Sequence, residues 1–66
     1  MNVFLVIQES NSIRNVESVW KTKKKALERA QALASISLME PDEDHADAWT
    51  DFEGAMVQVQ EEPVHE

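Results

Sequence analysis

The chain contains no cysteine and only one glycine, Gly54, among its 66 residues. Without cysteine it has neither disulfides nor thiolate metal ligands, which fits a reducing compartment. A single glycine also excludes a glycine-rich loop around a phosphate. A chain of this length forms one domain at most and buries only roughly 60% of the surface that its unfolded form exposes. Its stability must therefore come from regular packing or from association with another chain.

Motifs for catalysis are also missing. The sequence has no Gly-x-Ser-x-Gly motif and no cysteine nucleophile. Its two histidines, His45 and His65, lie in acidic segments that place no catalytic or metal-binding partner at helical or strand spacing. We therefore expect a protein that is not an enzyme and that uses no cofactor.

Asp42, Asp44 and Glu53 match three positions of a calcium-binding loop, but the match is poor. Ala46 stands where such a loop needs an oxygen ligand, and Asp47 stands where its sharp turn needs glycine. A solvated acidic loop without a metal is the expected interpretation.

The formal net charge of −7 is distributed unevenly along the chain. Residues 1–39 contain six basic and three acidic residues, a balance of +3. Residues 40–66 contain ten acidic residues and neither lysine nor arginine, a balance of −10. Such asymmetry indicates an electrostatic partner or an acidic tail.

The pattern of apolar residues predicts two strands and a helix in the first part of the chain. An uninterrupted apolar run over residues 2–8 is typical of a strand buried on both faces. Residues 13–20 predict a more polar edge strand, joined to the first by a hairpin. Thr22 can cap a helix over residues 23–38, which must end before Pro41.

Alternating apolar and polar residues over 55–60 predict a third strand. Gly54 marks either a bulge in one strand that starts near residue 48 or the tip of an additional hairpin, and we favour the bulge. The domain then spans residues 1–61, and residues 62–66 form a flexible acidic tail. The expected fold is α+β with ββαβ order: a three-stranded antiparallel sheet, strand order 2-1-3, with the helix on one face.

One helix leaves the second face of such a sheet open. In the apolar first strand Phe4 and Val6 point to one face and the odd-numbered residues point to the other. A large apolar side chain left in water forgoes roughly 1.5–3 kcal/mol of stabilisation. We expect Phe4 and Val6 to form the open face. A second copy or another partner covers it, or else the acidic loop folds over it with Trp49 or Phe52.

Four lysines surround the expected start of the helix: Lys21, Lys23, Lys24 and Lys25. Positive charge at this end opposes the helix dipole and predicts an anion nearby. The anion could be nucleic-acid phosphate or the acidic segment of the same or a neighbouring chain. A solvated lysine cluster is the simpler interpretation.

The acidic stretch over residues 40–53 contains two large aromatic residues. Carboxylates around aromatics are typical of a protein-binding surface, because the aromatics anchor a partner and the charges guide it. The aromatics could instead belong to the core, which we expect of Phe52 and leave open for Trp49. The expected partner-binding residues are Asp42, Glu43, Asp44, Asp47, Trp49, Asp51 and Glu53.

Residues 19–27, VWKTKKKAL, follow an apolar strand at residues 1–7. This arrangement resembles a pattern found in many small uncharacterised proteins of bacteria and their phages. The resemblance covers most of the chain and implies a ββαβ domain that closes with an acidic strand. Some phage-borne inhibitors of host defence are similar in size and acidity. The resemblance assigns no functional residue.

We therefore expect a small acidic accessory protein of phage or mobile-element type that binds a protein partner through its acidic half. Its most concrete form is an inhibitor of a host protein that handles nucleic acid. One alternative is a nucleic-acid-binding module that uses Arg14, Arg29 and the four lysines, which the net charge disfavours. Another is a homodimeric structural or regulatory domain. The short apolar start has no signal-peptide features and cannot cross a bilayer, so we expect a cytoplasmic location away from membranes.

Overall fold

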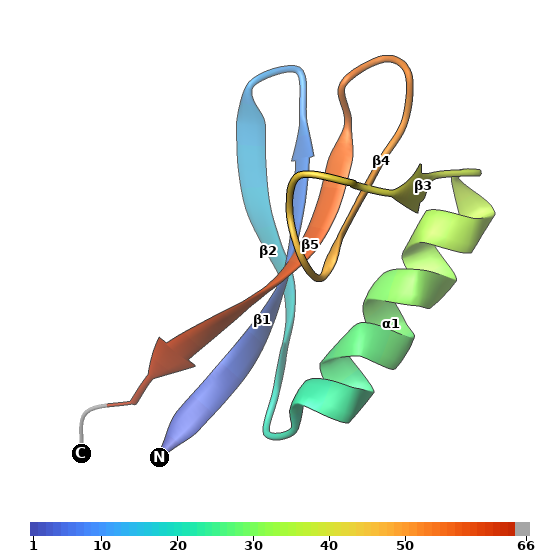
Figure 1. Cartoon of the computed structure of the whole chain (residues 1–66). Coiled ribbons are helices and arrows are strands. Elements are labelled where there is room, and N and C mark those ends of the chain that lie inside the picture. The colour runs from blue at the N-terminus through green and yellow to red at the C-terminus, as the bar shows by residue number, and fades with distance from the viewer. Residues whose placement is uncertain (65–66) are drawn as a thin grey trace.

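The computed structural model describes residues 1–64, and these residues form five strands and one helix. The elements are β1 (Asn2–Ser10), β2 (Ile13–Trp20), α1 (Lys23–Ile36), β3 (Glu40–Pro41), β4 (Ala48–Thr50) and β5 (Met56–Pro63). The strands pair antiparallel in one sheet of order β2-β1-β5-β4-β3, and α1 lies across one face of it (Figure 1).

The prediction of a three-stranded sheet with order 2-1-3 is wrong, although the chain is α+β. Two short strands account for the difference: β3 has two residues and β4 has three. Segments this short carry no readable alternation of apolar and polar residues, so only their pairing identifies them as strands. Gly54 lies in the loop between β4 and β5 rather than in a bulge. Its φ of 91° is one that glycine adopts without steric cost.

The last strand continues past the residue at which the domain was expected to end. Pro63 is still opposite Asn2 in the pairing of β5 with β1, and the Val64 amide donates to the Met1 carbonyl at 2.9 Å. Residues 62–64 are therefore tied to the N-terminal strand rather than forming a free tail. Residues 65–66, which include His65, lie outside the described part of the chain.

The core lies between α1 and the sheet. On the helix side, Ala26, Ala30 and Ala34 are buried, as the helical spacing predicts, and their small side chains let the helix approach the strands closely. Val6 of β1 and Val57 of β5 are buried opposite them. The half-buried apolar residues around this centre are Phe4, Trp20, Leu33, Met39, Trp49 and Val59.

The helix ends at Ile36, two residues earlier than expected, with a Schellman motif. The Leu38 amide donates to the Ser35 carbonyl at 3.3 Å, and the Met39 amide donates to the Ala34 carbonyl at 2.8 Å. This motif requires left-handed backbone angles at the residue after the cap, which is usually glycine. Here that residue is Leu38, with a φ of 56°.

Candidate functional site: the acidic surface and the Phe52 groove

The structure reverses the expected faces of β1. Phe4 and Val6, which we expected on the open face, pack against α1, and Val6 is fully buried. The open face is therefore lined by the odd-numbered residues of the strand, which are Val3, Leu5 and Ile7. Alternation shows which residues share a face, but both faces of this strand are apolar, so alternation does not show which one the helix covers.

Side chains of the sheet partly cover the open face. Arg14 of β2 donates to Gln60 of β5 at 2.5 Å, and β1 lies between those two strands. Arg14 is opposite Glu9 and Gln60 is opposite Leu5, so the Arg14 side chain passes over Ile7, the intervening residue on this face. The bridge explains why Ile7 is only 2% exposed even though it faces away from α1.

Two valines of β2 stay exposed beside this bridge. Val16 is 55% exposed and Val19 is 57% exposed, and they are opposite Ile7 and Leu5 of β1. Coverage of this face by a second copy of the chain remains a prediction.

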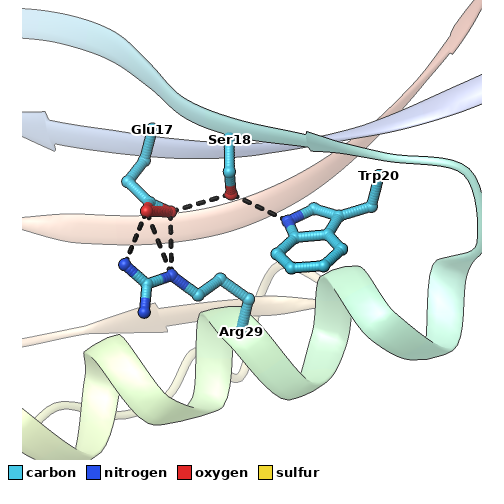
Figure 2. A network of polar contacts seen from close by, with 4 residues as sticks. All are labelled: Glu17, Ser18, Trp20 and Arg29. Carbon is cyan, nitrogen blue, oxygen red and sulfur yellow. Dashed lines mark hydrogen bonds and ion pairs between the residues drawn. The ribbon is translucent and has the colours of Figure 1, made fainter.

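A bulge in β2 turns Glu17 toward α1 (Figure 2). The pairing with β1 shifts after Val6, which is opposite Ser18, so that Glu17 is an extra residue on β2. Its carboxylate accepts hydrogen bonds of 2.7–3.2 Å from the Arg29 guanidinium. The Ser18 hydroxyl donates to Glu17 at 2.8 Å and accepts from the Trp20 indole at 2.8 Å. This network connects the helix to the edge strand and pairs the positive charge of Arg29 with a carboxylate.

The Glu17 network predicts a specific pH dependence of stability. The Arg29 hydrogen bonds hold the pKa of Glu17 below its ordinary value of 4.5. The ionised carboxylate therefore stabilises the folded state above about pH 4.5, and this contribution is lost as the pH falls through the lower folded-state pKa. Glu17→Gln should lower the free energy of unfolding at pH 7, and its effect should shrink progressively as the pH falls below 4.5, as measured by urea denaturation from pH 7 downward. Glu28→Gln, on the exposed side of α1, is the control, and a Glu17 effect that is constant with pH would contradict the prediction.

The lysines at the start of α1 have a carboxylate nearby in the same chain. Lys23 Nζ lies 3.1 Å from Asp47 Oδ2. The Thr22 hydroxyl accepts from the Lys25 amide at 3.4 Å, so the expected helix cap is present. The remaining side chains of the cluster are exposed: Lys21, Lys24 and Lys25. The sequence leaves open which anion lies near these lysines, and at Lys23 the structure places a carboxylate from the acidic half of the same chain.

The predicted acidic binding residues divide into two groups. Three aspartates are half-buried and bond to their own chain: Asp42, Asp47 and Asp51. The other carboxylates of residues 40–53 are exposed, and we call these the acidic surface: Glu40, Glu43, Asp44 and Glu53. The aspartates therefore shape the loops, and the exposed carboxylates are available to a partner.

Asp42 and Asp51 order the loops on either side of β4. Asp42 Oδ1 accepts from the Asp44 amide at 2.8 Å, and this bond holds the pKa of the Asp42 carboxyl below its ordinary value. Asp51 Oδ1 accepts from the Glu53 and Ala55 amides at 2.9 and 3.0 Å. Such bonds between a side chain and nearby backbone fix a turn. The Asp51 bonds fix the position of the tip of the β4–β5 loop.

Phe52 is at that tip and is 97% exposed, so the expectation that it belongs to the core is wrong. Trp49, whose place was left open, is half-buried and packs against the core. The two aromatics therefore have separate roles. Trp49 helps to hold β4 against the helix, whereas Phe52 contributes nothing to packing.

The end of α1 and the β4–β5 loop lie at the same end of the molecule (Figure 1). An open groove beside Phe52 is lined by residues from both segments. Its apolar lining consists of Pro41 and of two large side chains, Phe52 and Leu38, the latter 88% exposed. Four carboxylates also line this Phe52 groove: Glu40, Asp42, Glu43 and Asp51. Two exposed apolar side chains among carboxylates can anchor and orient a cationic protein surface.

The sequence pattern predicts neither the exposure of Leu38 nor that of Phe52. For Phe52 a signal was present, because Asp51 and Gly54 flank a turn-like segment and a hairpin tip at Gly54 would have exposed Phe52. For Leu38 no signal was available, since the helix end that exposes it normally contains glycine.

Within residues 1–64 no group of three or more histidine, aspartate or glutamate side chains is placed to hold a metal ion. His45 is exposed, and its Nδ1 lies 3.3 Å from Asp42. In the same part of the chain no helix is long and apolar enough to cross a bilayer; α1 has 14 residues. No protein-family model, curated protein or solved structure matches this chain.

Proposed function

We propose that this protein is a non-enzymatic binding protein that recognises a basic surface on a protein partner through its acidic surface and the Phe52 groove. The observation that carries this proposal is the 97% exposure of Phe52 between carboxylates. An exposed aromatic gains its burial energy only when another molecule covers it.

Charge and shape have different tasks in this binding. The carboxylates of the acidic surface and of the Phe52 groove attract a basic partner and repel an acidic one. Phe52 then fixes the position of the partner, because a large aromatic buried at the centre of an interface contributes far more than its rim charges.

The most concrete partner is a protein that handles nucleic acid. Carboxylates spaced along a surface can occupy a groove that otherwise holds phosphates, and the protein would then compete with the nucleic acid. A phage or mobile-element protein that inhibits such a host protein is the form of this proposal that fits the small size and acidity of the chain.

Two exposed glutamates of the groove provide a test. Tagged protein is used to capture partners from a bacterial lysate, alongside Glu40→Gln/Glu43→Gln and a matched control, Glu28→Gln/Glu61→Gln, which removes two exposed carboxylates elsewhere. We expect the first pair to reduce capture of a specific partner by about tenfold or more and the control to retain it. The captured partner should bind nucleic acid, and added single-stranded DNA or RNA should compete with capture. Equal recovery by both double variants would count against the proposal.

A nucleic-acid-binding module is less well supported, because its basic residues do not form one free surface. Arg29 is paired with Glu17, and Lys23 is paired with Asp47. Arg14 lies on the opposite face of the sheet and bonds to Gln60. The acidic half would in addition repel phosphate.

A further inference from the structure

Leu38 occupies a position where neither packing nor backbone geometry favours leucine. It is 88% exposed, so its side chain gains almost no burial energy. Its φ of 56° is left-handed, a conformation that residues with a side chain adopt at a steric cost and that glycine adopts freely. Unfavourable backbone angles of this kind are often kept at functional sites. An exposed apolar residue kept at such a cost calls for a role outside the fold.

Leu38 and Phe52 come from separate segments but line the same groove. Leu38 extends from the end of α1, and Phe52 extends from the β4–β5 loop. Glu40 and Glu43 line the groove as exposed carboxylates between these two segments of the chain. The result is a pair of exposed apolar side chains with acidic residues around them.

We propose that Leu38 and Phe52 together grip an apolar side chain of a protein segment that has lysine or arginine on both sides of that residue. This inference rests on the proposed function and specifies the chemistry of the partner. It also assigns Leu38, which lies outside the acidic stretch, a binding role that explains its unfavourable conformation.

Charge complementarity selects a cationic segment over other occupants. A second copy has the same net charge of −7 and nucleic acid has a phosphate at every residue, so both are repelled as whole molecules. An uncharged apolar segment would remove the carboxylates from water without compensating them. A segment with flanking lysine or arginine pairs with the carboxylates while its apolar residue is buried between Leu38 and Phe52.

Two synthetic peptides separate the apolar contact from charge alone. One alternates lysine with leucine, and the other has the same lysines with serine in place of leucine. Binding is followed by two-dimensional amide NMR, which reports on the groove residues and yields dissociation constants. The wild-type protein should bind the lysine–leucine peptide about tenfold more tightly, a difference of ~1.4 kcal/mol, with the largest shifts at Leu38 and Phe52.

Leu38→Asn and Leu38→Gly test the role of Leu38, because both residues tolerate left-handed angles. Each should bind the lysine–leucine peptide about tenfold more weakly than wild type. Leu38→Gly should also raise the melting temperature by about 2–5 °C, since it relieves the backbone without losing burial. Ile36→Asn is the matched control, because Ile36 is 79% exposed at the same helix end but does not line the groove.

The outcomes distinguish this inference from the proposed function. Equal affinity for the two peptides, or unchanged binding by the Leu38 variants, would contradict the proposal that Leu38 and Phe52 together bind an apolar side chain. An acidic binding surface would still stand. A lower melting temperature for Leu38→Gly would overturn the assignment of an unfavourable conformation to Leu38. If neither peptide binds, the inference falls, and capture with the Glu40→Gln/Glu43→Gln variant still decides the proposed function.

Discussion

Replacing Ala30 with leucine is expected to lower the melting temperature by about 10–20 °C. Ala30 is fully buried where α1 meets β1 and β5, opposite Val6 and Val57. A leucine there must push the helix off the sheet, at a cost of ~2–3 kcal/mol. A domain of this size has a total stability of only about 3–10 kcal/mol, so the loss is a large fraction of it.

Ala32→Leu is the matched control for this prediction. It makes the same substitution in the same helix, but Ala32 is exposed. Leucine and alanine have similar helix propensity, so the change in the free energy of unfolding should stay within ~0.5 kcal/mol. Thermal unfolding followed by far-UV circular dichroism measures both variants. Equal destabilisation by the two substitutions would mean that α1 does not pack through Ala30.

Truncation of the two aromatics of the acidic stretch should affect stability to very different extents. Trp49→Ala is expected to lower the free energy of unfolding by ~2–3 kcal/mol, somewhat less than for a fully buried aromatic, because Trp49 is half-buried against the core. Phe52→Ala is expected to change it by less than ~0.5 kcal/mol, because Phe52 is 97% exposed. Urea denaturation followed by circular dichroism compares the two on the same scale.

Partner binding should depend on Phe52 rather than on Trp49. Phe52→Ala keeps the fold and should lose the partner, whereas any folded fraction of Trp49→Ala keeps the groove wall at Phe52. Lys24→Ala, an exposed residue at the far end of α1, serves as a control for both measurements. If Phe52→Ala unfolds the domain, or if it keeps full capture of the partner, the separation of roles between the two aromatics is wrong.

The elements that the sequence predicts well are those whose pattern is long enough to read. The uninterrupted apolar run predicts β1, and the helical spacing with Thr22 as cap predicts α1. The alternation over residues 55–60 predicts β5, and β1 does lie between β2 and β5. Each of these segments contains enough residues for its period to be distinguished from chance.

The face of β1 that meets the helix was predicted incorrectly for a physical reason. The strand is apolar on both sides, so its alternation contains no preference between Phe4 with Val6 and the odd-numbered residues. The choice depends on how α1 packs after β2. The bulge at Glu17 also has no signal in the sequence, because the extra residue is defined by its pairing with β1 and not by its neighbours in the chain.

The sequence by itself determined the acidity of residues 40–66, the position of the helix and the lack of cysteine chemistry, because composition and period are properties of the chain alone. Only the tertiary structure decided that Phe52 is exposed, that Trp49 is packed, and that Leu38 meets Phe52 at one groove. These facts depend on where the end of α1 and the β4–β5 loop lie relative to each other. That relation is set by the pairing of β3, β4 and β5, which brings segments distant in sequence to the same end of the molecule.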